Sequence, residues 1–212
     1  MAKSTNARGR EAPGAGTEAS RPPEPRTLRL TSPKQMRALT HPIRLQILGR
    51  LRADGPATAT ALAARLGISV PLVSYHLRQL GETGYIEEAP ELARDERERP
   101  WRSSHDQTSW STVEFLDTPE RIAAQAAFTR EIVRAYAQDM ERFLDEAPTW
   151  PAEWVDASEM SDYLLDLTPE ELRALRAELT EVIGRYRNRG RGEGREQVHA
   201  IVNLLPRHRD EP

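Results

Sequence analysis

The stretch GISVPLVSYHLRQLGETGYI, residues 67–86, decides the fold of this chain because it joins a sharp turn to a helix with two different faces. Gly67 suits the left-handed residue that ends one helix, and Ser69 is a favourable cap for the next. This next helix is predicted over about Val70–Thr83. Its inward face repeats apolar side chains at helical spacing, at Val73, Leu77 and Leu80. Two helices joined by such a turn are typical of a helix-turn-helix.

The opposite face of this helix carries side chains of the kinds that contact DNA. Hydroxyl, guanidinium and amide groups hydrogen-bond to phosphates and to base edges in the major groove. For His76, a DNA contact and a structural role at the corner between the helices are equally open. For Arg78, a DNA contact is favoured over an ordinary solvated arginine. The predicted DNA-binding residues of this helix are Ser69, Pro71, Leu72, Ser74, Tyr75, His76, Arg78 and Gln79.

Three further helices are predicted upstream. Ser32 and Pro33 suit the start of the first, and Pro42 interrupts it because proline lacks the N–H group that a continuing helix needs. Either Thr58 or Thr60 can cap the third helix. The three helices are predicted over Pro33–Thr40, Pro42–Ala53 and Ala59–Leu66.

A β-hairpin is predicted after Gly84, where the spacing of apolar residues changes. Its strands are expected over Tyr85–Ala89 and Trp101–His105, with the charged loop Pro90–Pro100 between them. A hairpin in this position is a wing. Arginines in its loop alternate with acidic residues, which fits either a wing tip that follows the phosphate backbone or minor groove, or a solvated loop. The wing residues predicted to bind DNA are Arg94, Arg97 and Arg99.

A long helix is predicted from Pro119 to Glu146, with Thr118 as its cap. Its apolar positions alternate steps of four and three residues, which is the 3.5-residue repeat of a seam between two helices. We interpret this stripe as the interface of a homodimer, in preference to a helix that packs only within its own subunit. The predicted dimer interface is Ile122, Ala126, Thr129, Val133, Tyr136, Met140 and Phe143.

The last part of the chain predicts a small strand–helix–strand unit. Thr168 caps its helix, Pro169 occupies the first turn, and Glu171 completes a capping box, so the helix is expected to end near Asn188. The flanking strands are expected at residues 163–165 and 198–205. Aromatic side chains here fit core packing, which is favoured, or the lining of a pocket for an unidentified small-molecule effector. These residues are Trp150, Trp154 and Tyr163.

Charge is distributed unevenly along the chain. Its 212 residues have a net charge of -3, yet residues 33–80 contain 7 basic and 1 acidic side chains, while residues 106–212 contain 13 basic and 22 acidic ones. A basic first part followed by an acidic second part indicates that the first part contacts polyanions. Residues 1–31 have almost no large apolar side chain and are expected to form a disordered tail.

Several classes of protein are disfavoured by what the sequence lacks. With no cysteine there are no disulfides and no thiolate metal sites, and the five histidines show no metal-ligand spacing. No apolar run is long enough for a membrane span and the first residues do not form a signal peptide, so we expect a cytoplasmic protein. The chain also has no phosphate-binding loop, nucleophile elbow or His-Glu-x-x-His motif. We therefore expect no catalytic residues and no cofactor.

Two motifs resemble the ArsR-type winged helix-turn-helix regulators. HPIRLQIL, residues 41–48, is similar to the opening motif of that family, and residues 69–80 with Gly84-Tyr85-Ile86 are similar to its recognition helix and wing entry. The resemblance covers residues 33–105 and implies a homodimer that binds an operator palindrome through double-stranded DNA contacts. The family's metal sensors use cysteines, or His and Asp pairs on the dimer helix. This chain has neither, so metal sensing is not carried over. The extension after the wing resembles accessory domains of actinobacterial members.

Together these features predict a mainly α fold with a small β content (α+β). The expected organisation is a disordered tail (1–31), a winged helix-turn-helix (32–117), a dimerisation helix (118–147) and an accessory unit (148–212). The expected function is sequence-specific DNA binding by a homodimeric transcriptional regulator, most simply a repressor. The alternative is a winged-helix module that binds another protein and does not bind DNA. The charge and polarity of residues 33–80 favour DNA.

Overall fold

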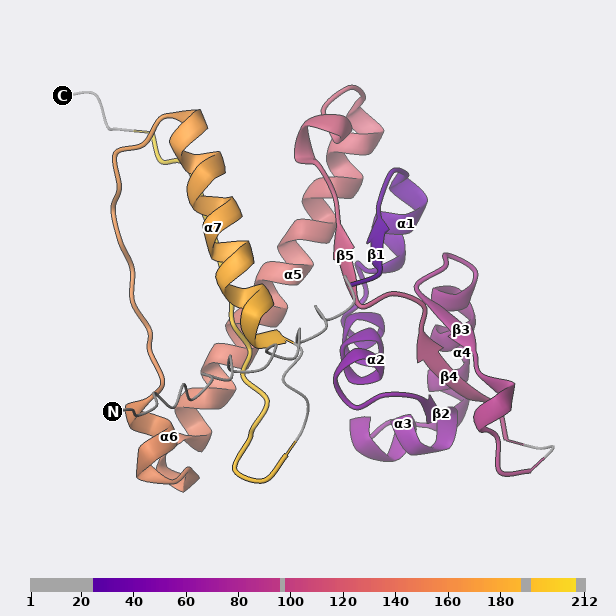
Figure 1. Cartoon of the computed structure of the whole chain (residues 1–212). Helices are drawn as coiled ribbons and strands as arrows, with labels where there is room; N and C mark the ends of the chain where they lie inside the picture. Colours follow the sequence, from indigo (N-terminus) through magenta and orange to yellow (C-terminus); the bar gives the residue numbers. More distant parts are fainter. Residues whose placement is uncertain (1–24, 96–97, 188–191, 209–212) are drawn as a thin grey trace, which may run out of the picture.

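The computed structural model describes residues 25–95, 98–187 and 192–208. It confirms the predicted α+β fold class, with a winged helix-turn-helix followed by long helices (Figure 1). The helices of the first part are α1 (Pro33–Ala38), α2 (Pro42–Ala53), α3 (Ala59–Leu66) and α4 (Val70–Gly81). Both α1 and α4 end two residues before the predicted positions.

Short polar side chains determine where these helices begin. Ser32 and Gln35 form a capping box at the start of α1, in which each side chain bonds to the other residue's backbone. The ring of His41 caps α2, because its Nδ1 accepts the Ile43 N–H at 3.2 Å. Of the two candidate caps for α3 the structure uses Thr58, whose Oγ1 accepts the Ala61 N–H at 3.2 Å.

The predicted turn and inward face of the helix-turn-helix are confirmed. Gly67 ends α3 with φ 65°, a left-handed conformation that costs glycine little and other residues more. The inward side chains of α4, which share the core with residues of α2 and α3, are all buried: Val73, Leu77 and Leu80. Burying three such side chains contributes on the order of 5 kcal/mol before the entropy of ordering is subtracted.

The wing is a three-stranded antiparallel sheet in the order β2-β4-β3. The predicted hairpin is present with shorter strands, and the chain before α3 adds a third strand. Gly81 lets the sheet approach the end of α4, since a Cβ there would lie 3.0 Å from Cζ3 of Trp101. The Tyr85 side chain is buried and donates its hydroxyl to the Gln35 carbonyl at 2.9 Å. The strands are β2 (Ala57–Thr58), β3 (Ile86–Glu88) and β4 (Pro100–Ser103), with a short turn, η1 (Pro90–Leu92), inside the wing.

The predicted disordered tail of residues 1–31 is wrong for its last residues. Strand β1 (Thr27–Arg29) pairs in parallel with β5 (Gln107–Ser109), and Leu30 is completely buried in the core. The Leu30 N–H donates to the Ser109 carbonyl at 2.8 Å. The partner strand lies 80 residues further along the chain, so the local sequence around β1 does not reveal the pairing. Residues 1–24 lie outside the described residues.

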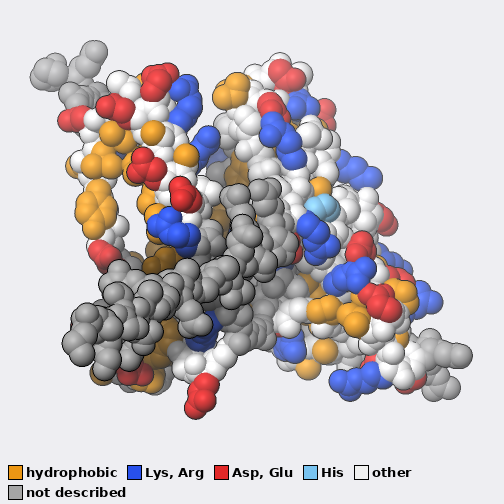
Figure 2. Space-filling model, viewed as in Figure 1, with side chains coloured by type: hydrophobic (Ala, Val, Ile, Leu, Met, Phe, Trp, Pro, Cys, Tyr) orange, Lys and Arg blue, Asp and Glu red, His pale blue; other side chains and the backbone are white. Residues whose placement is uncertain are grey.

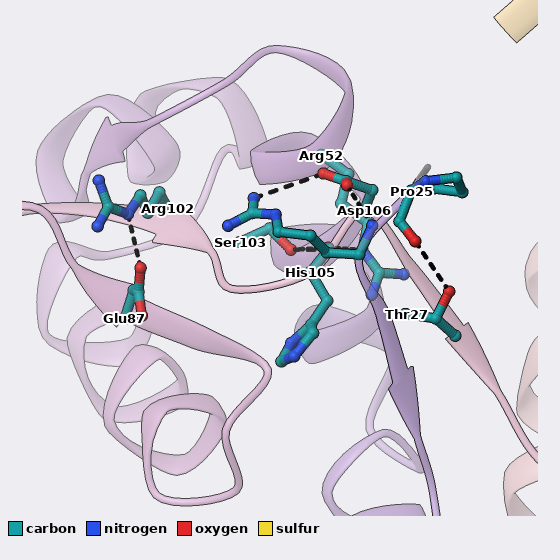
Figure 3. Close-up of polar contacts among 9 residues, drawn as sticks. Pro25, Thr27, Arg52, Glu87, Arg102, Ser103, His105 and Asp106 are labelled. Carbon is teal, nitrogen blue, oxygen red and sulfur yellow. Dashed lines mark hydrogen bonds and ion pairs between the residues drawn. The ribbon is translucent and has the colours of Figure 1, made fainter. Parts of the chain in front are cut away.

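A partly buried arginine ties α2 to the chain between the wing and β5. Arg52 Nη2 donates to Thr108 Oγ1 at 2.8 Å, and its Nε donates to the His105 carbonyl at 3.2 Å. Figure 3 shows this arginine close to Ser103 and His105. Burial lowers the pKa of Arg52, which nevertheless keeps its charge because the pKa of arginine is so high. The guanidinium therefore connects α2 to the start of β5.

Helix α5 (Pro119–Glu146) has the predicted bounds and the predicted cap, Thr118, whose Oγ1 accepts the Arg121 N–H at 3.3 Å. A short turn, η2 (Thr112–Phe115), leads into it. One face of α5 belongs to the core of the winged helix-turn-helix: Ala124 and Phe128 are buried there, and α1 packs against it. The first turns of α5 are therefore part of the domain predicted to end at residue 117.

The predicted strand–helix–strand unit is wrong, because residues 163–165 and 198–205 form no strand. A strand needs a partner for its N–H and C=O groups, and the described part of this region supplies none to either segment. The helix between them is confirmed, with the capping box of Thr168 and Glu171. The elements after α5 are η3 (Ala147–Thr149), α6 (Ala152–Asp156) and α7 (Pro169–Arg187).

The role of Leu30 provides a test of the ordered β1 segment. Leu30→Ala should lower the free energy of unfolding by about 2–5 kcal/mol, because it removes a completely buried side chain from the core. Urea unfolding followed by circular dichroism measures the difference. Leu116→Ala, which changes an exposed leucine, is the matched control and should alter stability by less than about 0.5 kcal/mol. Equal effects of the two substitutions would contradict the burial of Leu30.

Candidate nucleic-acid interface

The outward face of α4 presents most of the predicted DNA-binding residues to solvent. Pro71, Leu72, Tyr75 and Arg78 are exposed, and Ser74 and Gln79 are partly exposed on the same side of the helix. The inward face anchors this surface from behind, because the buried apolar residues of α4 leave the helix no freedom to rotate. This is the geometry of a recognition helix, whose first turns enter the major groove.

The polar groups of this face are only weakly engaged within the protein. Ser69 stands at the N-cap of α4 with extended backbone, but its hydroxyl makes no capping hydrogen bond. Arg78 Nε donates to the Ser74 carbonyl at 3.3 Å, one turn earlier on the same helix. Gln79 Nε2 donates to Glu82 Oε2 at 3.4 Å. Long hydrogen bonds of this kind are readily exchanged for contacts with phosphates or bases.

The prediction that His76 faces DNA is wrong. Its side chain is only 3% exposed and lies against the ring of His41, with 4.4 Å between the ring centroids. Neither ring nitrogen of His76 has a hydrogen-bond partner in the described structure. The ring of His76 therefore packs inside the domain, and the bond to the corner between the helices that was considered for it is absent among the described residues. Burial lowers the pKa of His76, and nearby His41 and Arg44 lower it further.

Much of the positive charge counted between residues 33 and 80 is used inside the domain. Arg50 and Arg65 both approach Asp54, with N–O distances of 3.7 and 3.4 Å, and Arg37 forms an ion pair with Glu120 at 2.6 Å. Figure 2 shows the Lys and Arg side chains of the winged-helix part mixed with carboxylates on the side turned to the viewer. The charge count from sequence therefore overstates the field available to a polyanion. The informative feature of the charge pattern is local: residues 59–81 contain no carboxylate.

The wing combines arginines with more acidic residues. Arg99 lies 3.8 Å from Glu88 and its side chain is highly exposed, while the backbone N–H of Arg94 donates to Glu98 at 3.0 Å. Arg97 lies outside the described residues. Sequence reasoning missed Arg102, which pairs with Glu87 at 2.7 Å across β4 and β3 (Figure 3). Arg102 also pairs with Glu91. These exposed ion pairs contribute little to stability but reduce the positive potential of the wing.

The predicted dimer seam lies on the side of α5 away from the core. Val133 and Met140 are 58% and 40% exposed, and Ile122 is exposed as well. The described C-terminal segment occupies one position of the seam, because the ring of His199 packs edge-on to Tyr136 with 5.5 Å between centroids. The other members are partly buried: Ala126, Thr129 and Phe143.

The aromatic residues considered for an effector pocket do not converge. Trp150 and Trp154 lie near each other, with ring centroids 6.3 Å apart, whereas Tyr163 is exposed and its hydroxyl donates to Glu159 at 3.4 Å. Within the described residues no group of three or more His, Asp or Glu side chains could hold a metal ion. Across the same ranges, the helices are too short or too polar to cross a membrane.

Residues 39–88 match the family described as "Helix-turn-helix domain". The match spans α2, α3, α4 and the first strand of the wing hairpin, which are the elements that position the outward face of α4. The fold and the match together define this part of the chain as a winged helix-turn-helix domain, the class of domain found in DNA-binding transcriptional regulators. No curated protein is similar enough to match the chain.

Solved structures of two bacterial proteins are similar to the chain. A mutant of ZitR from Lactococcus lactis in apo form is 17% identical, with 72% of this chain and 87% of that chain covered and a TM-score of 0.31. A mutant of MepR from S. aureus bound to an oligodeoxyribonucleotide is 21% identical, with 72% of this chain and 78% of that chain covered and a TM-score of 0.25.

The burial of His76 predicts an acid-sensitive stability. The unfolded chain protonates this histidine near its ordinary pKa of about 6.5, whereas the folded chain resists the proton. The contribution of neutral His76 to the free energy of unfolding should therefore be fully present above about pH 6.5. It should be lost as the pH drops from there towards the lower pKa of the folded state. Urea unfolding between about pH 7.5 and about pH 5 measures this slope.

The matched comparison replaces one histidine at a time. His76→Leu should flatten the pH dependence, because no proton is then excluded by folding. His208→Leu, at an exposed position, should leave the slope as in the wild type. A slope that is the same in His76→Leu as in the wild type would assign the acid sensitivity to other groups.

Proposed function

We propose that this protein is a sequence-specific, homodimeric transcriptional regulator of the ArsR type, which binds a palindromic operator in double-stranded DNA and acts as a repressor. The observation that carries the proposal is the outward face of α4. This face is exposed, held from behind by buried Val73, Leu77 and Leu80, and lies in a stretch of chain without carboxylates. The helix-turn-helix match over residues 39–88 supports it.

In the proposed complex, α4 lies in the major groove. Tyr75 and Arg78, which are both exposed on the outward face, can reach base edges or phosphates. Ser69 and Ser74 can donate hydroxyl hydrogen bonds to the same groups. The free N–H groups at the first turn of α4 add a partial positive charge towards a phosphate. Gln79 completes the set at the far end of the face.

The wing arginines are proposed as contacts to the phosphate backbone. Arg94 and Arg99 are the described members, and Arg99 must exchange its 3.8 Å approach to Glu88 for a phosphate oxygen. Because exposed ion pairs contribute little, that exchange costs little. The surrounding carboxylates nevertheless oppose a polyanion, so we assign base reading to α4 and a secondary role to the wing.

A homodimer would join two helix-turn-helix domains through α5. The seam residues Val133 and Met140 point away from the core of their own subunit, and a partner helix would bury them. Two recognition helices related by a two-fold axis contact two half-sites about one helical turn of DNA apart, which is why the operator is expected to be a palindrome. An effector, if one acts, would bind in the part after α5.

A double substitution on α4 tests the DNA-binding surface. Tyr75→Ala combined with Arg78→Ala should weaken binding to a duplex selected from a random-sequence pool by at least about tenfold, because two groups of the reading face are removed. Fluorescence anisotropy measures the affinity. Circular dichroism should show unchanged helix content, since both side chains are exposed.

The matched control removes an arginine of the same charge from another helix. Arg185→Ala, on exposed α7, should leave the affinity unchanged. If the α4 double variant binds like the wild type, the recognition face is assigned incorrectly. If the wild type selects no duplex even at low salt, where phosphate contacts are strongest, the protein-binding alternative gains support.

Charges introduced into α5 test the dimer. Val133→Glu combined with Met140→Glu should produce monomers in sedimentation analysis, because carboxylates would be buried in the seam. Val113→Glu combined with Met160→Glu adds the same charge at two exposed positions outside α5 and should leave a dimer intact. A dimer that survives the first pair would place the interface on another surface.

A further inference from the structure

The first turns of α4 expose apolar side chains where a recognition helix meets bases. Leu72 and Tyr75 are 40% and 51% exposed, and Pro71 is exposed beside them. These residues lie on one side of the helix, because positions three and four apart are neighbours on a helix surface. The core of the domain does not need them, since α4 already buries its opposite face.

The guanidinium and amide groups of the same helix lie further along it than this apolar cluster, whereas its first turns add only the short hydroxyls of Ser69 and Ser74. Arg78 donates back to the Ser74 carbonyl, and Gln79 donates towards Glu82 near the C-terminal end of α4. Base edges are contacted mainly by the N-terminal residues of a recognition helix. The longest exposed side chains in the first turns of α4 are therefore mainly apolar, while the guanidinium and amide donors lie at a level suited to phosphates or to the outer base pairs.

Only one group in the major groove is apolar, the C5-methyl group of thymine. We propose that Pro71, Leu72 and Tyr75 form an apolar surface that selects thymines in the operator half-site by contact with their methyl groups. This inference rests on the DNA-binding function proposed above and adds its base preference. The occupant is DNA and not another protein because Arg65 and Arg78 are the only charged residues between positions 59 and 81.

The energetic basis is the removal of apolar area from water on both sides of the contact. Covering one methyl group with a leucine or aromatic side chain should strengthen binding about threefold to fourfold. Cytosine offers an amino donor at the matching edge and no methyl group, so it would leave a polar group facing Leu72 without a partner. The selection against cytosine should therefore exceed the gain from the methyl group alone.

The test begins with a duplex selected from a random-sequence pool by the full-length protein. Each thymine of the half-site is then replaced in turn by deoxyuridine, which keeps the base pair and its O4 acceptor and removes only the methyl group. Binding should weaken about threefold to fourfold at one or more positions. The dependence of affinity on salt should stay the same, because the phosphate contacts are unchanged.

Protein variants connect the effect to α4. Leu72→Asn and Tyr75→Ser should each remove the difference between thymine and deoxyuridine at the position that the side chain contacts. Leu116→Asn, at an exposed leucine outside the interface, should keep that difference in full. This comparison separates a direct contact from any change that deoxyuridine makes in the DNA itself.

The outcomes distinguish the two proposals. A selected duplex that binds tightly and is indifferent to deoxyuridine at every position overturns the methyl contact and leaves the DNA-binding function intact. A selected half-site that contains no thymine also overturns the methyl contact and leaves the DNA-binding function intact. If no duplex is selected, the proposed function fails, and the exposed apolar surface is then better explained as a site for another protein.

Discussion

The packing of the inward face of α4 against α2 and α3 is the constraint on which the functional surface depends. Val73, Leu77 and Leu80 are buried at helical spacing, so the rotation of α4 about its own axis is set by the core. Gly67, in a left-handed conformation, lets α4 leave α3 at the angle that makes this packing reachable. Because both constraints act from behind the helix, its outer side chains remain exposed and available for a ligand.

Around this core, contacts between distant segments position elements that the local sequence does not specify. The Arg52 guanidinium holds the corner before β5, β5 pairs with β1, and β1 brings Leu30 into the core. The first turns of α5 close the same core through Phe128, whose ring meets Trp110 edge-on with 4.9 Å between centroids. The winged helix-turn-helix therefore shares its core with the helix proposed to form the dimer. A partner bound along α5 would touch a helix that shares its hydrophobic core with α4.

Charge is distributed in a way that separates structure from recognition. Most arginines around α2 and the wing are engaged with carboxylates or carbonyls, as Arg102 is with Glu87. The stretch that presents the outward face of α4 has no carboxylate, and its apolar residues Leu72 and Tyr75 remain exposed. Such a surface suits a partner that offers phosphates at its edge and methyl groups at its centre, which describes a thymine-containing major groove.

The helix-turn-helix, the Ser32 and Thr118 caps and the inward face of α4 could be predicted from the sequence because they depend on neighbours within a few residues. Gly67 and the helical spacing of Val73 and Leu77 are local signals of the same kind. Only the tertiary structure decided the rest. Strand β1 needs a partner 80 residues away, and His76 is buried because His41 on another helix lies over it. The strands expected near the C-terminus found no partner among the described residues. Strand pairing and side-chain burial depend on contacts between distant segments. The periodicity of one segment therefore does not predict them.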